Sequence, residues 1–155
     1  MSKQSYRIHK NVFLWLFLPL TIGLSGSLLL RRKKTNKTAF NRIDSTKFKN
    51  LKKYIIAQSK VESANYSSPL FLRANNAFGM KNALYRTQLG EKVYSDPYRY
   101  YENLEESIDD FLLYLDFVDF PLKVENTTDY AFNLKKLGYY ESDPNDYVRA
   151  LNSWL

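Results

Sequence analysis

The chain of 155 residues contains no cysteine and a single histidine, His9. Without cysteine, the protein has no disulfide scaffold, no thiol nucleophile and no zinc site built on cysteine ligands. One histidine excludes a metal site with several histidine ligands and argues against a Ser-His-Asp triad. Any catalytic chemistry must therefore rest on carboxylates, tyrosines, lysines or arginines.

Aromatic residues are, by contrast, abundant, with 13 tyrosines, 10 phenylalanines and 2 tryptophans. This content is too high for a disordered chain, so we expect a packed core. A chain of this length holds one domain of ordinary size with a short appendage, and not two full domains.

The net charge of +7 is distributed unevenly along the chain. Residues 1–60 carry 14 lysines and arginines against one acid, Asp44, whereas residues 61–155 carry 9 basic and 15 acidic residues. The two parts therefore have net charges of +13 and −6. Basic charge beside a hydrophobic segment is typical of membrane targeting. Nucleic-acid binding through residues 31–53 is disfavoured, because the acidic part would repel phosphate, and we expect no nucleic-acid partner.

Residues 12–30 form a run of 19 residues without a charge. About 20 apolar residues in a helix span the hydrocarbon core of a bilayer, so we predict a transmembrane anchor or signal-anchor. A cleaved signal peptide is the alternative, since small residues stand at Ser25–Ser27, but Leu28–Leu30 extend the apolar run beyond them. The predicted organisation is a basic tail (1–11), the anchor (12–30), a basic linker (31–44) and a globular domain (45–155).

Helix-start and helix-stop residues predict a mainly helical α+β fold with a small β-hairpin lobe. The first expected elements are a helix over Thr46–Glu62, a short helix from Ser68–Pro69 closed by Gly79, and a hairpin over 82–101 with its turn at Leu89–Glu91. Three helices are expected to follow: one from Asn103 to Val118, one that starts at Thr128 or Asp129 and is stopped by Gly138 as the residue just beyond its end, and one from Asp143–Pro144 to Trp154. We interpret the four acids of the helix after Asn103 as a solvated face and not as metal ligands, because adjacent helix positions point in different directions; they are Glu105, Glu106, Asp109 and Asp110.

Glu62 stands at the C-terminal end of a predicted amphipathic helix. The helix dipole disfavours negative charge at that end, and apolar neighbours such as Val61 and Phe78 would remove water from the carboxyl. Both effects favour the protonated form, which suits a general acid. The alternative is an ordinary surface glutamate, which is the commoner environment for this residue type.

Three blocks of sequence resemble one family. Ala57–Gln58, Glu62–Ser63 and Asn76–Lys81 are similar to the first signature of the N-acetylglucosaminidases with a lysozyme-like fold, the flagellar-type and phage enzymes of glycoside hydrolase family 73. Tyr98–Phe111 and Leu137–Tyr147 are similar to its second and third blocks. The three blocks occur in the family's order over about residues 46–155.

The resemblance implies hydrolysis of the β-1,4 bonds of peptidoglycan between N-acetylglucosamine and N-acetylmuramic acid, with glycan strands as the partner and no cofactor. The family's catalytic acid corresponds to Glu62. Its active-site tyrosine corresponds to Tyr140 when counted back from Asp143–Pro144, or to Tyr139 when counted from Gly138, because this chain has one residue more than the usual spacing. The family's middle-block aromatic corresponds to Tyr101, which would line the sugar cleft.

An inverting glycosidase also needs a second carboxylate, which activates water from the opposite face of the sugar. We predict Glu91 for this role and Asp96 as second choice; either is alternatively an ordinary turn acid. Further candidate substrate contacts are Asn76, Phe78, Tyr139 and Asp96. For Asn76, the alternative is a side chain that satisfies the turn backbone, and for the tyrosines it is core packing.

A different class of function remains open at this point. A lysozyme-like module that binds peptidoglycan without hydrolysing it, in a phage particle or an envelope apparatus, would explain the missing clear base and the extra residue near Tyr139. The location is also open. More basic residues follow the hydrophobic segment than precede it, so the positive-inside rule favours a cytoplasmic domain, which conflicts with a wall substrate. We expect a membrane-anchored protein of the cell envelope, of unassigned sidedness.

Overall fold

The computed structural model describes residue 36 and residues 38–155. The predicted basic tail (1–11), the predicted anchor (12–30) and most of the predicted linker lie outside these residues. Among the residues that the structure describes, no helix combines the length and the apolar character needed to cross a bilayer.

The described part of the chain is mainly helical with one two-stranded antiparallel sheet, which confirms the predicted α+β class. In chain order the elements are η1 (Phe40–Ser45), η2 (Lys49–Leu51), α2 (Lys52–Glu62), α3 (Pro69–Ala74), β1 (Glu91–Lys92), β2 (Arg99–Tyr100), α4 (Leu104–Phe117), α5 (Thr127–Lys136) and α6 (Pro144–Asn152). In the sheet, Glu91 pairs with Tyr100 and Lys92 pairs with Arg99.

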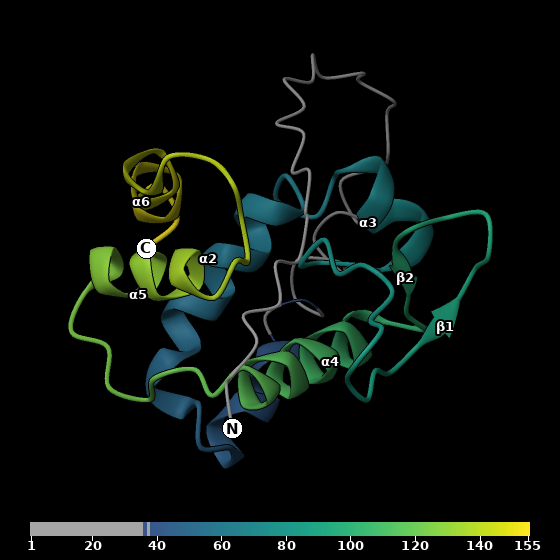
Figure 1. Ribbon diagram of the computed structural model, residues 1–155, viewed down its shortest axis with the longest axis horizontal. Helices are drawn as coiled ribbons and strands as arrows, with labels where there is room; N and C mark the ends of the chain where they lie inside the picture. Colours follow the sequence, from purple (N-terminus) through teal and green to yellow (C-terminus); the bar gives the residue numbers. More distant parts are fainter. Residues whose placement is uncertain (1–35, 37) are drawn as a thin grey trace, which may run out of the picture.

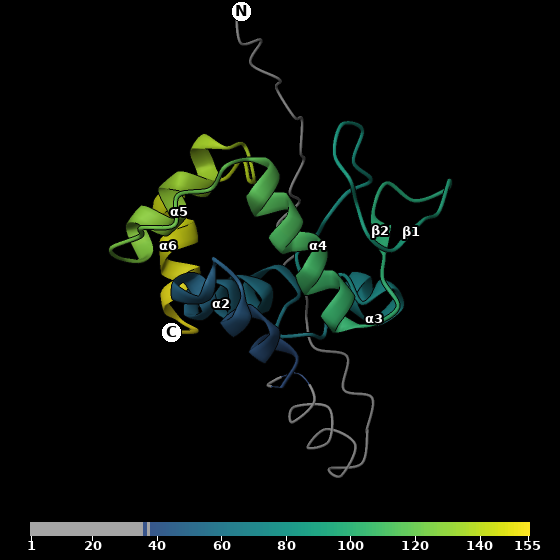
Figure 2. The same ribbon diagram turned by 90° about the horizontal axis from the view of Figure 1, so that it is seen from below.

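The helices surround one core, and the sheet forms a lobe at one end of the domain. Figures 1 and 2 show α5 and α6 side by side at one end, next to α2, and β1 and β2 at the other end, next to α3. Helix α4 lies between the two ends in both views. The C-terminal end of α2, which carries Glu62, therefore leads from the helical part toward α3 and the lobe.

Local capping explains where the helices begin. Asn103 accepts a hydrogen bond from the amide of Glu106 at 2.9 Å, and Asp143 accepts one from the amide of Asn145 at 2.7 Å. These side chains satisfy amides that the first helical turn leaves unpaired, so the predicted caps of α4 and α6 are confirmed. Helix α5 ends at Lys136, and Gly138 follows two residues later with a φ of +73°, a conformation that glycine favours.

Several predicted bounds are wrong. The helix predicted from Thr46 begins only at Lys52, because the Thr46 hydroxyl accepts the amide of Phe48 and the chain makes a 3-10 turn first. The short helix ends at Ala74 and not at Gly79, because Asn75 takes a left-handed conformation and donates its side-chain amide to the carbonyls of Tyr101 and Glu102.

The hairpin also differs from the prediction. Its turn lies between Lys92 and Arg99, so Glu91 is a strand residue and the turn is not at Leu89–Glu91. Arg99 explains this placement: its guanidinium donates to the carbonyls of Leu89 at 2.6 Å and Gly90 at 2.7 Å, which fixes that stretch against β2. Helices α4 and α6 end at Phe117 and Asn152, one and two residues before their predicted ends, whereas α5 ends at Lys136, which places Gly138 at the predicted position just beyond the helix.

The packed domain begins before residue 45, so the boundary of the predicted linker is wrong. Ala39, Phe40 and Ile43 are buried in the core, and Arg42 forms a bidentate ion pair with Asp109 of α4. Two large apolar side chains in a basic stretch are the physical reason, since burying them stabilises the fold by about 1.5–3 kcal/mol each.

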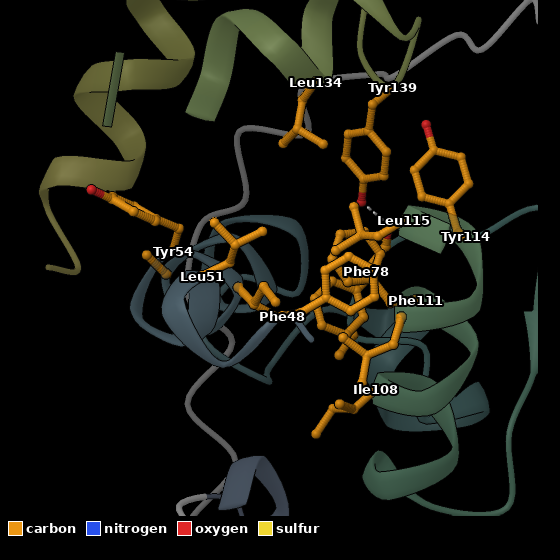
Figure 3. Close-up of a cluster of buried hydrophobic side chains, with 14 of the residues drawn as sticks. Phe48, Leu51, Tyr54, Phe78, Ile108, Phe111, Tyr114, Leu115, Leu134 and Tyr139 are labelled. Atoms are coloured by element: carbon orange, nitrogen blue, oxygen red, sulfur yellow. Dashed lines mark hydrogen bonds between the residues drawn. The ribbon is translucent and has the colours of Figure 1, made fainter. Parts of the chain in front are cut away.

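The core centres on stacked aromatic rings. Phe78 lies parallel to Phe111, with ring centroids 4.1 Å apart, and Tyr139 meets Phe111 edge-on at 5.9 Å. Figure 3 shows Tyr139 reaching from the segment after α5 down onto this stack, with Tyr114 of α4 beside it. The aromatic rings thus connect the segment before α6, helix α4 and the turn around Phe78.

The acidic face predicted for α4 is not uniformly solvated. Asp110 has an exposed fraction of 0% and pairs with the Arg86 guanidinium through two hydrogen bonds of 2.9 and 2.8 Å. Although burial raises the pKa of Asp110, hydrogen bonds from Arg86 and Tyr101 hold it below the ordinary value of 3.8. This buried pair ties the segment before β1 to α4.

Candidate active site

Glu62 is the last residue of α2, and Gln58 precedes it by four positions. Residues four apart lie on the same face of a helix. This face of α2 points toward α5 and α6, because Gln58 contacts Tyr130 of α5 and Glu62 contacts Tyr147 of α6. Gln58 is fully buried, whereas Glu62, one turn further on, is half-buried. The polar face therefore runs from the core toward the surface and ends at a carboxyl.

The phenol of Tyr147 holds this carboxyl. Its hydroxyl donates a hydrogen bond to Glu62 Oε1 at 2.7 Å, across 85 positions of sequence. Asp143 caps α6 and Pro144 opens it, so Tyr147 falls on the first turn of the helix, where it faces α2. Tyr147 is itself buried, so little water competes for the hydrogen bond.

Three buried tyrosines near Glu62 stay protonated at neutral pH. Burial is the main reason that the pKa values of Tyr130, Tyr139 and Tyr147 lie well above 10, and the negative charge of Glu62 raises them further. A protonated phenol is a hydrogen-bond donor. Tyr147 is therefore in its donor form at neutral pH.

The other two tyrosines form a polar layer beneath the carboxyl. Tyr130 donates to Gln58 Oε1 at 2.5 Å, and Tyr139 donates to the carbonyl of Phe78 at 2.5 Å (Figure 3). The Gln58 side chain also faces Tyr139 and lowers its pKa against the effect of burial. This layer fixes the backbone at Phe78, immediately before Gly79.

Gly79 lies directly against the carboxyl. A Cβ at this position would stand 3.7 Å from Glu62 Oε2, which is van der Waals contact. Its φ of +61° is in the left-handed region, where a side chain is disfavoured. Because residue 79 is a glycine, no side chain from this position covers Oε2, whereas Oε1 accepts a hydrogen bond from Tyr147.

Tyr139 and Tyr140 both lie in the interior near this site. The Tyr140 hydroxyl donates to the carbonyl of Ala131 at 3.0 Å, and burial, reinforced by Asp143, raises the pKa of Tyr140 to about 12. Its ring stacks on the ring of Tyr147. Of the tyrosines in the third block, Tyr147 therefore bonds to Glu62, and Tyr140 stacks on Tyr147.

Asn76 and Phe78 are also buried. The Asn76 amide donates to the carbonyls of Met80 and Arg99 at 2.8 Å each and accepts the Met80 amide at 2.9 Å. Its side chain thus satisfies the turn backbone, which is the alternative that the sequence leaves open. Phe78 contributes its ring to the core stack and its carbonyl to Tyr139.

Tyr101 and Asp96 serve the lobe in this structure. Tyr101 is buried and donates to Asp110 Oδ2 at 2.7 Å. Asp96 accepts hydrogen bonds from Arg73 at 2.7 Å, Tyr100 at 3.0 Å and the amide of Tyr98 at 3.0 Å. Although burial raises its pKa, these bonds hold the pKa of Asp96 below 3.8. Glu91 lies on β1 with its side chain exposed.

The structure therefore brings together Glu62, Tyr139 and Tyr140 from the predicted set, and places Glu91, Asp96 and Tyr101 in or under the lobe. Sequence reasoning assigned no catalytic or substrate-binding role to Tyr147, Gln58 or Gly79. The signal for Gln58 is its spacing of four from Glu62. Within the described residues, no group of three or more acidic or histidine side chains is arranged to hold a metal ion.

A half-buried carboxyl, held by a phenol at the end of a helix, is the kind of acid that glycoside hydrolases use. Residues 40–155 match the family model Glucosaminidase, described as mannosyl-glycoprotein endo-beta-N-acetylglucosaminidase. The match covers most of the chain, and the chain belongs to this family of glycosidases, which confirms the resemblance seen in the sequence. Searches of curated proteins and of solved structures gave no match.

Proposed function

We propose that this protein is a peptidoglycan hydrolase that cleaves the β-1,4 bond between N-acetylglucosamine and N-acetylmuramic acid, with Glu62 as the general acid on a lysozyme-like domain. The observation that carries the proposal is the hydrogen bond from Tyr147 to Glu62 Oε1 in a chain of the glucosaminidase family. A carboxyl at a helix C-terminus, half-buried and oriented by a partner, fits proton transfer to a leaving group.

The two carboxyl oxygens have different surroundings: Oε1 accepts the hydrogen of Tyr147, and Oε2 lies next to Gly79. These contacts support our proposal that Oε2 carries the transferable proton in the acid form. Oε2 gives this proton to the glycosidic oxygen as the bond to the anomeric carbon breaks and an oxocarbenium-like state develops. The Tyr147 hydrogen bond then stabilises the carboxylate that remains.

A water molecule must next attack the anomeric carbon and lose a proton to a base. We propose Glu91 for this step. It lies on β1 with an exposed carboxylate, whereas Asp96 is occupied by Arg73, Tyr100 and the amide of Tyr98. Because the Glu91 carboxylate is exposed, it is accessible to a glycan strand that binds at the lobe and to the attacking water.

The full chain and its Glu62→Gln variant test this proposal in a peptidoglycan zymogram. We expect clearing by the wild type and loss of clearing by Glu62→Gln, which keeps the side chain's shape and its acceptor oxygen. Retained clearing by Glu62→Gln would overturn the assignment of the acid. If wild-type protein binds insoluble peptidoglycan and releases no reducing ends, the chain is a binding module and not an enzyme.

The bond that is cut is read from the product. Borohydride reduction followed by mass spectrometry labels the sugar at each new reducing end. We expect the reduced form of N-acetylglucosamine at these ends. Reduced N-acetylmuramic acid would show that the other wall bond is cut and would contradict the proposed specificity.

We further propose that residues 12–30 anchor the domain to a membrane, because they form 19 uncharged residues flanked by basic ones. Extraction of membranes at alkaline pH tests this: an anchored protein stays in the pellet, and release into the supernatant contradicts the proposal. A reporter fused to the C-terminus decides on which side of the membrane the domain lies.

A further inference from the structure

The segment immediately after Glu62 has an unusual backbone. Ala64, Asn65 and Tyr66 follow one another with φ values of 48°, 55° and 65°. Residues with a Cβ are disfavoured in this left-handed region, where glycine is the usual occupant. Three in succession persist only where the surroundings over-determine the conformation. The turn between α2 and α3 is therefore held by specific interactions.

Ser63 supplies most of these interactions. It is fully buried, and both its amide and its hydroxyl donate to the carbonyl of Ser59, at 3.1 and 2.6 Å. The same hydroxyl oxygen accepts the amide of Tyr66 at 2.8 Å. The Ser63 carbonyl accepts the amides of Ser67 at 3.0 Å and Ser68 at 2.9 Å. One hydroxyl thus links the last turn of α2 to the third left-handed residue.

Tyr66 provides a second link to the same helical turn. Its phenolic oxygen lies 2.8 Å from Ser59 Oγ, and its ring packs on Phe71 of α3 with centroids 5.3 Å apart. Ser59 is one turn before Ser63 on α2, so the left-handed residues are tied back to the helix that carries the carboxyl. The turn that follows Glu62 is therefore bonded to the helical turn that precedes it.

The end of α2 determines where the carboxyl points. Glu62 is the last residue of α2, and its Oε1 lies 2.7 Å from the Tyr147 hydroxyl. Displacements near 1 Å in an active site reduce rates about 100-fold. We propose that Ser63 is a positioning residue: its hydroxyl holds the left-handed turn and thereby keeps the Glu62 carboxyl against Tyr147. The link to catalysis rests on the proposed function; the positioning itself does not.

The first test compares kinetics of the full chain with those of three variants. Ser63→Ala removes the hydroxyl, Ser63→Thr keeps it, and Ser68→Ala is the matched control, because it removes the cap of α3 at the far end of the same turn. We expect kcat to fall at least 10-fold in Ser63→Ala with KM within 2-fold, and to be largely recovered in Ser63→Thr. Ser68→Ala should lose stability and keep kcat within 2-fold.

A double variant guards against a fold defect. In the Ser63→Ala background, Ala64→Gly removes a side chain from a left-handed position, which lowers the cost of the turn. We expect this second change to restore part of the lost kcat. A Ser63→Ala variant that keeps wild-type kcat would overturn the proposal. So would a loss of kcat of the same size in Ser68→Ala.

The second test does not depend on activity. The ¹³C resonance of Tyr147 Cζ reports the hydrogen bond to Glu62, and we expect Ser63→Ala to move it and Ser68→Ala to leave it in place. If Ser63→Ala leaves it unmoved while the wild type hydrolyses the wall, the positioning role is wrong and the proposed function stands. If the resonance moves but the wild type releases no reducing ends, the positioning role of Ser63 stands and the proposed function is wrong.

Discussion

The ring of Tyr140 stacks on the ring of Tyr147, with centroids 4.1 Å apart and planes inclined by 20°. Tyr147 bonds to Glu62, whereas the Tyr140 hydroxyl bonds to a backbone carbonyl of α5. The two tyrosines of this sequence block therefore have different roles: Tyr147 contacts the carboxyl, and Tyr140 packs against the ring of Tyr147. Substitutions that separate ring from hydroxyl distinguish these roles.

Removing the hydroxyl of Tyr147 is expected to reduce catalysis. Tyr147→Phe keeps the stacked ring but deletes the donor to Glu62, and hydrogen bonds to charged groups contribute about 1.5–3 kcal/mol. Expressed as a rate, this corresponds to a loss of kcat of about 10- to 150-fold. Steady-state release of reducing ends measures it. A kcat equal to that of the wild type would show that the hydrogen bond does not assist the reaction.

At Tyr140 the ring should matter more than the hydroxyl. Tyr140→Phe leaves the carbonyl of Ala131 without this donor and should cost about 1 kcal/mol of stability, with kcat nearly unchanged. Tyr140→Ala also removes the ring under Tyr147 and should cost about 3–5 kcal/mol. Thermal unfolding and kcat are measured together. A large loss of kcat in a stable Tyr140→Phe would instead indicate that this hydroxyl acts in catalysis.

Gly79 is expected to be intolerant of a side chain. Gly79→Ala places a methyl group in contact with Glu62 Oε2 at a φ of +61°, so we expect a loss of about 1–2 kcal/mol in stability and a further loss of kcat. Gly138→Ala is the control, because Gly138 also has a positive φ, of +73°, and a Cβ there would meet nothing within 4 Å. A drop in kcat that is equal in the two variants would remove the link to Oε2.

The buried Arg86–Asp110 pair predicts a pH dependence of stability. The folded-state pKa of Asp110 is below its ordinary 3.8, so its contribution is complete above pH 3.8 and is lost as the pH falls from there through the folded-state value. Asp110→Asn should cost about 3–5 kcal/mol at neutral pH and flatten this acid slope.

The matched control is Asp109→Asn, which breaks the half-exposed pair with Arg42 and should cost about 0–1 kcal/mol. Urea unfolding between pH 2 and pH 6 compares the three proteins. An unchanged slope in Asp110→Asn would mean that other carboxyls dominate acid unfolding.

Local signals predicted the starts of α4 and α6 and the end of α5. These signals act over a few residues, on neighbouring amides and carbonyls, and can therefore be recognised from a short stretch of sequence. They are the caps Asn103 and Asp143 and the terminating Gly138. The position of Glu62 at the end of α2 was predictable for the same reason, from the apolar period before it and the break after it.

The partner of Glu62 was not predictable in this way. Tyr147 reaches the carboxyl because α6 packs on α2, 85 positions away, and no local pattern distinguishes it from Tyr139 or Tyr140. The burial of Asp110 was also not predictable from local sequence. The helical pattern places Asp110 on a polar face, but in the fold it is buried and paired with Arg86. Ala64–Tyr66 contain no glycine, so the residue type that most favours a left-handed conformation is missing from this turn.

The burial of Phe40 and Ile43 limits how far the domain can lie from the hydrophobic run of residues 12–30. With the packed domain beginning at Ala39, only residues 31–38 separate it from the hydrophobic run that ends at residue 30. Eight residues extend at most about 28 Å, near 3.5 Å for each. If residues 12–30 lie in a bilayer and the domain hydrolyses peptidoglycan, as proposed, so short a connection would confine hydrolysis to the glycan closest to the lipid.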